Sequence, residues 1–222
     1  MKASRSQTIE AVIFDLDGTL LDTLADLADS VNRVLLGKGL PDHPLDAYRY
    51  FVGEGATMLI RRALPKSHQD EATIQAFLNC FIADYSKNWH VSTRPYPGIP
   101  EMLTQLASRD LQLAVLSNKP DDFTKLCVTR FLPATGFAAV FGQRPETARK
   151  PDPAGALAIA RLLDLPPAAF LYLGDTGIDM ETAKVAGMFA VGATWGFRPA
   201  AELLQHGAQE VINHPAELIN LL

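Results

Sequence analysis

The sequence has few of the residues that bind metals through sulfur or nitrogen. It holds two cysteines in 222 residues, Cys80 and Cys127, and neither lies at the spacing of a metal-binding motif. We therefore expect both to be reduced, packed residues of a cytoplasmic protein. The histidines are scattered and show no paired ligand spacing: His43, His68, His90, His206 and His214. A metal held by cysteine or histidine is therefore not expected.

Long apolar runs and excess positive charge are also lacking. No run of about 18 apolar residues occurs, so no membrane-spanning helix is expected. Met1–Ser6 has some positive charge but no apolar stretch after it, which argues against a secretory signal. The net charge of −5 gives no general attraction to nucleic acid or to an anionic membrane. These features give no reason to expect a nucleic-acid or membrane partner, and they leave the oligomeric state open.

The chain has an ordinary globular composition, with 48% hydrophobic and 20% charged residues. Short apolar runs alternate with segments of helical period, which predicts a parallel sheet with helices on both faces. The expected strands are 11–14, 111–116, 170–173 and 189–193, and 211–212 is a candidate edge strand. The expected helices are roughly 100–109, 121–132, 153–164 and 177–187.

Residues 24–90 break this alternation. Apolar residues recur there at helical spacing in two long stretches, and a shorter helical piece between them is interrupted at Gly53-Glu54-Gly55. No strand pattern is evident, so we expect a helical subdomain inserted after the first strand. Its hinges are expected near Thr23 and Ser92, before the stiff segment Arg94–Gly98 with its two prolines.

Two carboxylates follow the first predicted strand, in Asp15-Leu16-Asp17-Gly18-Thr19. At positions i and i+2 of an extended chain they point in similar directions. One can attack phosphorus while the other handles the proton of the leaving group. The alternative is an acidic turn with Gly18 at its corner. Ligands of open α/β sheets bind beyond the carboxyl ends of the strands, which favours a site here.

Polar residues also follow the second and third strands. Ser117-Asn118 offers a hydroxyl and backbone amides of the kind that bind phosphate oxygens. Asp175 and Asp179 lie four residues apart where a loop enters a helix, and together they can hold a hard cation. Asp179 is also at the third helical position after Thr176, as in a capping box, so a structural role is an alternative. Lys150, before a proline-fixed helix start, can pair with phosphate or remain exposed.

These motifs, in this order, resemble those of the haloacid dehalogenase-type phosphatases. That family has an Asp-x-Asp-Gly-Thr box, a later Ser or Thr, a Lys before Pro, and a Gly-Asp-x-x-x-Asp box. The resemblance covers nearly the whole chain. It implies a Rossmann-like core of residues 1–22 and 93–222, with a small helical cap at 23–92.

The resemblance also implies a role for each motif residue. Asp15 is expected to be the nucleophile and a metal ligand, and Asp17 the general acid and base, with its backbone carbonyl on the metal. Lys150 is expected to neutralise the charge shared by the phosphate and the nucleophile. Asp175 is expected to bind the metal directly, with Asp179 supporting it. Ser117 and the backbone near Asn118 are expected to bind the phosphoryl oxygens.

Electrostatics agrees with this set of roles. Like charges about 4 Å apart repel by about 4 kcal/mol at an effective dielectric near 20, so a phosphate cannot approach these aspartates unaided. A divalent cation and Lys150 are needed, and Mg²⁺ suits a site with oxygen ligands only. The expected reaction is magnesium-dependent hydrolysis of a small phosphorylated metabolite through phospho-Asp15.

Within the family, the chain most resembles phosphoglycolate phosphatases and their relatives. The resemblance lies in Asp17–Thr23, in Val52–Gly55, in Trp195–Pro199 and in the C-terminal tail. Cap residues touch the leaving group, so Gly53, Glu54 and Gly55 are candidates for substrate specificity. Arg61 and Arg62 are further candidates, with exposure to solvent as the alternative.

Other activities of the same fold remain open at this stage. A phosphomutase of the β-phosphoglucomutase kind uses the same phospho-aspartate but passes the phosphate to a sugar. A binding protein without catalysis would have no need of the intact aspartates and Lys150. A dehalogenase shares the aspartate nucleophile, but the second carboxylate, Asp17, and the acidic pair at 175 and 179 favour phosphate chemistry.

Overall fold

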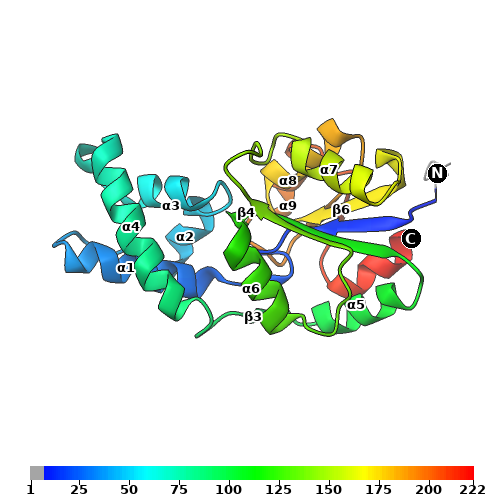
Figure 1. Cartoon of the computed structure of the whole chain (residues 1–222), viewed down its shortest axis with the longest axis horizontal. Coiled ribbons are helices and arrows are strands. Elements are labelled where there is room, and N and C mark those ends of the chain that lie inside the picture. The colour runs from blue at the N-terminus through cyan, green and yellow to red at the C-terminus, as the bar shows by residue number, and fades with distance from the viewer. Residues whose placement is uncertain (1–7) are drawn as a thin grey trace.

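The core of the protein is a six-stranded, fully parallel sheet with the strand order β5-β4-β1-β6-β7-β8 (Figure 1). A computed structural model describes residues 8–222, so the expectation for Met1–Ser6 lies outside the described residues. The strands are β1 (Ala11–Phe14), β4 (Gln112–Pro120), β5 (Ala139–Gln143), β6 (Phe170–Gly174), β7 (Phe189–Ala193) and β8 (Glu210–Ile212). The predicted α/β fold class is confirmed.

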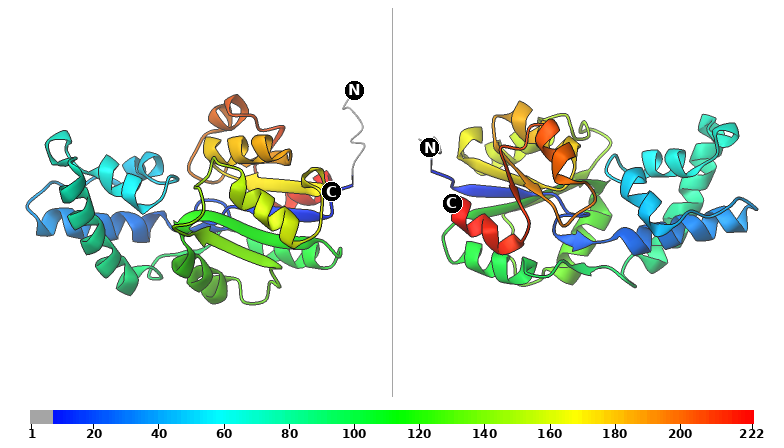
Figure 2. Two further views of the ribbon diagram at one scale, coloured as in Figure 1. Left: turned by 45° about the horizontal axis from the view of Figure 1, so that its top comes forward. Right: turned by 180° about the vertical axis from the view of Figure 1, so that it is seen from behind.

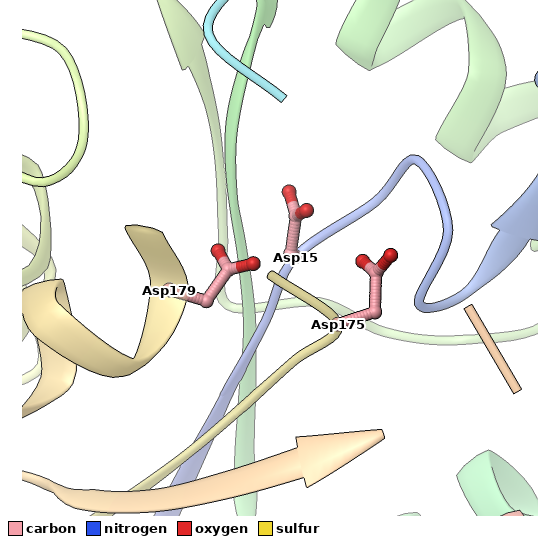
Figure 3. Close-up of side chains that lie close together, drawn as sticks. All are labelled: Asp15, Asp175 and Asp179. Atoms are coloured by element: carbon pink, nitrogen blue, oxygen red, sulfur yellow. The ribbon is translucent and has the colours of Figure 1, made fainter. Parts of the chain in front are cut away.

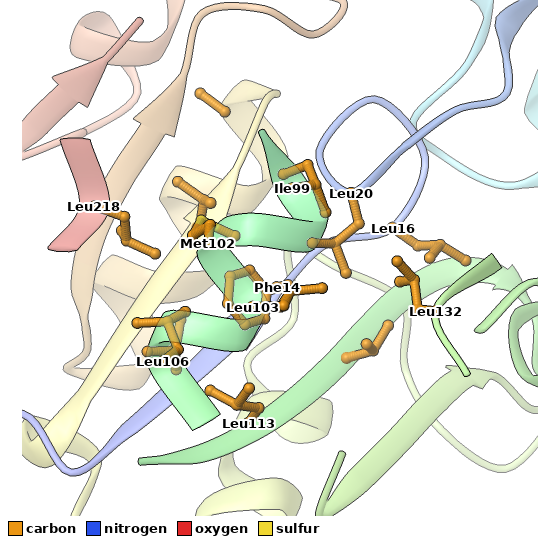
Figure 4. Close-up of a cluster of buried hydrophobic side chains, with 14 of the residues drawn as sticks. Phe14, Leu16, Leu20, Ile99, Met102, Leu103, Leu106, Leu113, Leu132 and Leu218 are labelled. Atoms are coloured by element: carbon orange, nitrogen blue, oxygen red, sulfur yellow. The ribbon is translucent and has the colours of Figure 1, made fainter. Parts of the chain in front are cut away.

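Helices cover both faces of the sheet because successive strand residues point to opposite faces. Val12 and Phe14 of β1 pack in one apolar cluster with α5, α6 and the 3₁₀ helix η3, and Figure 4 shows α5 lying over this face. Ala11 and Ile13 pack on the other face with α7, α8 and α9. The bounds are α5 (Ile99–Ala107), α6 (Asp121–Phe131), α7 (Ala154–Leu162), η2 (Pro167–Ala169), α8 (Gly177–Ala186), α9 (Ala200–Gln205) and η3 (Pro215–Leu221). With both faces covered, the central strands β1 and β6 are apolar along their length.

A helical unit stands beside the carboxyl end of this sheet (Figures 1 and 2). It consists of α1 (Leu24–Gly37), α2 (Leu45–Phe51), α3 (Ala56–Ala63), η1 (Lys66–His68) and α4 (Glu71–Asn88). These helices share an apolar cluster of their own, in which α1 packs along α4. The glycine pair predicted to interrupt this unit separates α2 from α3, with positive φ at Gly53 and Gly55. We call these helices the cap.

The two chain segments that join the cap to the core run side by side. They form the short antiparallel pair β2 (Leu21–Asp22) and β3 (Arg94–Pro95). The buried carboxylate of Asp26 also accepts hydrogen bonds from the backbone amides of Ser92 and Thr93, both at 2.8 Å. The start of α1 is thus tied to the returning chain, which fixes how the cap leaves the core.

The sheet differs from the sequence prediction in two strands. β5 was not predicted, because it is only partly buried and its apolar run ends after three residues, at Gly142. β4 was predicted to end at Leu116, but it continues to Pro120 with buried polar residues. Pairing with β5 extends to Pro120 after a register shift, so the partner strand supports an end that the apolar pattern did not predict. Across residues 8–222, no helix has the length and apolar character needed to cross a bilayer.

Candidate active site

The three predicted strand ends meet because β4, β1 and β6 are neighbours at the centre of the sheet. Asp15 directly follows β1, Ser117 lies in the last part of β4, and Asp175 directly follows β6. The carboxyl ends of parallel strands lie at the same edge, so residues far apart in sequence share one site. Figure 3 shows the carboxylate of Asp179 pointing toward Asp15, with the side chains of Asp15 and Asp175 directed to the same side.

Three of the predicted aspartates form a buried carboxylate cluster. Carboxylate oxygens of Asp15, Asp175 and Asp179 lie within 4.8 Å of one another. The Lys150 ammonium lies against this cluster, 2.8 Å from Asp15 Oδ1 and 2.7 Å from Asp179 Oδ1. It also donates to the backbone carbonyl of Leu116 at 3.0 Å, so its three N–H donors are all used. Lys150 is thereby held beside the carboxylate that sequence reasoning assigns as the nucleophile.

The charges of this cluster are not balanced by the protein alone. Burial and the nearby Asp179 carboxylate raise the pKa of Asp15 to about 7, although Lys150 opposes the rise. Burial, then repulsion by Asp15 and Asp179, raises the pKa of Asp175 well above its usual range. The Asp15 and Asp179 carboxylates in turn outweigh burial and keep Lys150 charged with a raised pKa. A set of buried carboxylate oxygens with one cation among them fits a hard divalent ion.

Asp179 caps the start of α8, the structural role that the sequence had suggested as an alternative to metal binding. Its Oδ2 accepts hydrogen bonds from the backbone amide of Thr176 at 3.1 Å and from the Thr176 hydroxyl at 2.6 Å, which caps α8. Its Oδ1 accepts from Lys150. A Cβ on Gly174 would lie 2.3 Å from the Cβ of Asp179, so glycine is needed at that position. Asp179 therefore anchors both the helix start and the lysine.

The turn after β1 requires glycine as well. Gly18 has φ of +90°, a conformation that side chains disfavour. A Cβ there would also lie 2.3 Å from Asp175 Oδ2 and 2.7 Å from the Phe197 ring. Thr19 Oγ1 donates to Asp175 Oδ1 at 2.8 Å, so the Gly-Thr pair of the first motif positions the aspartate of the last one.

Lys119 is a site residue that sequence reasoning missed. Its ammonium lies 3.0 Å from Asp17 Oδ1 and donates to the hydroxyl of Tyr85, a residue of α4, at 2.8 Å. Burial disfavours the charged form, but Asp17 and Tyr85 outweigh it and raise the pKa of Lys119. A lysine directly after Ser117-Asn118 at the end of a buried strand was the available signal. It was given no role because its partners, Asp17 and Tyr85, are far from it in sequence.

The two predicted phosphate-binding residues of β4 have different surroundings. The Ser117 side chain is buried and accepts a hydrogen bond from the Lys119 amide at 3.2 Å. The Asn118 side chain donates to the carbonyls of Gly53 and Lys150, at 3.0 and 3.1 Å, and accepts from the Lys150 amide. The Asn118 side chain thus links Gly53 of the cap to Lys150 of the core. Because the side chain is occupied in this way, the backbone of Asn118 is the part that can contact a phosphate.

A pocket that is partly open to solvent lies between the cap and the strand ends. Its walls include Gly53 and Gly55, whereas Glu54 is not among its lining residues and pairs with Arg62 instead. Arg61 pairs with Glu71 outside the pocket. The core residues that line it are Asp15, Asp17, Ser117, Asn118, Lys119, Pro120 and Phe123. The cap residues are Leu27, Val52, Gly53, Gly55, Ala56, Leu59, Phe81, Ile82 and Tyr85.

The segment after β7 joins the cap to the cluster. The amide of Phe197 donates to Asp175 Oδ2 at 2.8 Å, while its ring is buried among the apolar side chains of the cap. Arg198 donates to the carbonyl of Val52 at 3.3 Å, and Arg49 of α2 donates to the carbonyl of Gly196 at 3.0 Å. The cap is therefore in contact with the core above the carboxylates.

Replacing Asp175 with asparagine is expected to stabilise the metal-free protein at pH 7.5. Asp15 and Asp175 have raised pKa values in the folded state, so folding retains protons that the unfolded chain releases above about pH 4. The free energy of unfolding of the wild type without metal should therefore fall as the pH rises from about 4 through 7. The variant removes a buried carboxyl group that the folded protein keeps protonated at a free-energy cost when the pH is above 4. Allowing for weakened hydrogen bonds to Thr19 and Phe197, we expect a gain of about 2 kcal/mol.

Denaturant unfolding in EDTA at pH 5 and pH 7.5 measures this effect. The variant should be more stable than the wild type at pH 7.5, and the difference should shrink at pH 5. Asp152→Asn, at an exposed carboxylate near the same edge, is the matched control. A variant less stable than the wild type at pH 7.5 would show that hydrogen bonds outweigh the repulsion.

Comparison with known proteins agrees with this geometry. Residues 12–193 match the family described as haloacid dehalogenase-like hydrolase, and the chain belongs to that family. The match begins in β1, ends with β7, and so contains every residue of the carboxylate cluster together with Lys150.

Among its relatives, the phosphoglycolate phosphatase of Pseudomonas putida is 36% identical over 84% of this chain and 70% of its own length. That of Psychrobacter arcticus is 31% identical over 96% of this chain and 95% of its own. A crystal structure from Lactobacillus delbrueckii subsp. bulgaricus superposes with a TM-score of 0.90 at 27% identity, over 97% of this chain and 98% of that one. A second, described as a predicted phosphoglycolate phosphatase from Haemophilus somnus, has a TM-score of 0.87 at 28% identity, over 96% and 97%.

Proposed function

We propose that this protein hydrolyses a small phosphomonoester through a phospho-aspartyl intermediate on Asp15, with 2-phosphoglycolate as the first candidate substrate. The chain is a phosphatase of the haloacid dehalogenase-like family, since relatives named phosphoglycolate phosphatase match nearly its whole length. The observation that carries the mechanism is the position of Asp15. Its carboxylate lies at the end of the central strand, 2.8 Å from Lys150, and lines the pocket under the cap.

In the first step, a carboxylate oxygen of Asp15 attacks phosphorus in line with the ester bond. The P–O bond to the leaving group breaks, and Asp17 gives its proton to the departing oxygen. In the second step, Asp17 takes a proton from water, whose oxygen attacks the phosphorus of phospho-Asp15. The bond between phosphorus and Asp15 breaks, and inorganic phosphate leaves with the carboxylate restored.

Lys150 and the backbone around Ser117 and Asn118 are proposed to hold the phosphoryl oxygens during both steps. Lys150 lies against Asp15 before substrate binds, so its charge is already in position when the phosphate arrives. The proposed role of Asn118 is to position Lys150, because its side chain accepts a hydrogen bond from the Lys150 amide.

The carboxylate cluster is proposed to bind Mg²⁺ through Asp15, Asp175 and the backbone carbonyl of Asp17, with Asp179 in a supporting position. A divalent ion bound there supplies the positive charge that lets an anionic phosphate approach an anionic nucleophile. Asp179 has both carboxylate oxygens engaged, with Lys150 and with Thr176. We therefore assign it to holding Lys150 and α8, with contact to the ion through water.

The cap, proposed to comprise residues 23–92, is assigned to enclosing the leaving group and excluding water. Gly53 and Gly55 lie against the core, since the Gly53 carbonyl accepts a hydrogen bond from Asn118 and a Cβ on Gly55 would lie 3.3 Å from the Asn118 carbonyl. Glu54 then acts indirectly, by pairing with Arg62 and holding the loop between α2 and α3. A cytoplasmic location and the absence of a nucleic-acid partner remain predictions from the sequence.

The test is phosphate release from a panel of small phosphomonoesters that includes 2-phosphoglycolate and glucose 1-phosphate. We expect release with Mg²⁺ and a loss of about 100-fold or more in EDTA, restored by adding the ion back. Conversion of glucose 1-phosphate to glucose 6-phosphate without release would instead indicate a mutase. Folded, Mg²⁺-loaded protein that releases no phosphate from any ester would overturn the proposed function.

A further inference from the structure

The pocket between cap and core has an uneven distribution of charge. Its cap side is mostly apolar, with Leu27, Val52, Leu59 and Phe81 among the lining residues. Such a wall offers few hydrogen-bond partners to a leaving group that carries many hydroxyls, such as a sugar. Among the lining residues that the structure describes, Lys119 is the one cationic side chain. A leaving group that binds well here is therefore small and has a negative charge within reach of that ammonium.

Lys119 is fixed in position for such a contact. Its ammonium is held from the core side by Asp17 and from the cap side by the Tyr85 hydroxyl. Nζ lies 3.0 Å from Asp17 Oδ1 and 3.3 Å from Oδ2, a pair of contacts that one N–H can make by sharing, and a second N–H goes to Tyr85. The third N–H of the ammonium is then left for a ligand in the pocket. Lys119 is 6% exposed, so its charge is poorly hydrated and its attraction to an anion is strong.

The position of Lys119 relative to the reaction limits where the anion can be. Asp17 is proposed to protonate the leaving-group oxygen, which places that oxygen within about 2.8 Å of the Asp17 carboxylate. Lys119 Nζ lies 3.0 Å from the same carboxylate. A negative group one or two bonds beyond the ester oxygen therefore reaches Lys119, whereas a group farther along the leaving group extends past it toward the apolar wall.

We infer that Lys119 binds a carboxylate of the leaving group and makes this site selective for phosphate esters of small 2-hydroxy acids. This inference rests on the proposed function. In 2-phosphoglycolate, a single methylene separates the ester oxygen from the carboxylate, which matches the reach of Lys119. The lysine also adds positive charge to a site rich in carboxyl groups, where a substrate that carries both a phosphate and a carboxylate would otherwise be repelled.

The alternative is that Lys119 only neutralises Asp17 and joins it to the cap. The two roles differ in how removal of the charge affects two matched substrates. 2-Phosphoglycolate and 2-hydroxyethyl phosphate share the ester oxygen and the two-carbon chain, and differ in a carboxylate against a neutral hydroxymethyl group. A purely structural lysine would change kcat/KM for both esters by the same factor.

The experiment compares kcat/KM for the two esters in the wild type, Lys119→Met and Lys119→Arg. We expect the wild type to prefer the anionic ester by about 100-fold, and the methionine variant to lose most of that ratio through a higher KM. Lys119→Arg keeps the charge and should keep the preference within about tenfold. Tyr85→Phe keeps the lysine and is the control for loss of the cap contact alone.

Each outcome decides between the roles. A wild type that hydrolyses both esters with equal kcat/KM overturns the inference, without any variant having to fold. An unchanged ratio in a folded methionine variant, shown by circular dichroism, overturns it as well. Absence of phosphate release from every ester by the wild type would instead refute the proposed function, so the two failures are distinguishable.

Discussion

Replacing Asp15 with asparagine is expected to lower kcat by about 10⁴-fold or more, because an amide cannot attack phosphorus. The variant should still fold. The introduced asparagine keeps the size of the aspartate, can accept a hydrogen bond from Lys150, and removes one charge from a crowded anionic cluster. Phosphate release under saturating Mg²⁺ and substrate measures the effect, and thermal unfolding shows that the fold is retained.

Two further observations make this prediction specific. Wild-type protein stopped with acid during turnover should retain labelled phosphate from the substrate on Asp15, and the asparagine variant should retain none. Asp22→Asn, at an exposed carboxylate seven residues away on β2, is the matched control and should keep kcat within about threefold. An Asp15→Asn protein with more than about one per cent of the wild-type kcat would rule out Asp15 as the nucleophile.

Removing the Lys150 ammonium is expected to damage both catalysis and stability. In Lys150→Met, the charges of Asp15 and Asp179 lose their buried counter-ion, and removing one partner of a buried pair costs about 3–5 kcal/mol. Catalysis should fall by about 10³-fold, because the lysine stabilises the charge on the transferring phosphoryl group. Urea unfolding gives the first quantity, and phosphate release in excess Mg²⁺ gives the second.

The control for Lys150 is the exposed ion pair of Lys125 with Asp121 on α6. Its lysine side chain is 58% exposed, so Lys125→Met should change the free energy of unfolding by less than about 1 kcal/mol. It should leave kcat unaffected, since Lys125 is neither in the carboxylate cluster nor among the residues that line the pocket. If Lys150→Met were as stable and as active as this control, the pairing seen with Asp15 and Asp179 would have no catalytic or structural importance.

The fold class could be predicted because the apolar pattern is strong where the sheet is buried on both faces. Strands such as 11–14 and 170–173 are continuous apolar runs, and each ends abruptly in polar or glycine residues. β5 was missed for the opposite reason. It lies at the sheet edge, is only partly buried, and forms by pairing with β4, a long-range contact that no local pattern reveals.

The candidate site could also be predicted in part, namely for those residues whose importance shows in the local sequence pattern. Asp15 and Asp175 were identified because each directly follows a buried apolar run, at the sheet edge where ligands of open α/β sheets bind. Lys119 was missed because its importance depends on Asp17 and Tyr85, which are far from it in sequence. Glu54 was predicted to contribute to substrate specificity because it lies between two glycines. In the structure its side chain pairs with Arg62 instead.

The sequence by itself determined the alternation of strands and helices, the helical insertion, and the four motifs with the chemistry that their residue types allow. Local periodicity and residue type carry that information, since both act over a few neighbouring residues. Tertiary structure decided which charges face one another: Lys150 between Asp15 and Asp179, and Lys119 between Asp17 and the cap. Those pairings depend on strand order and on cap position, which come from packing across the whole chain.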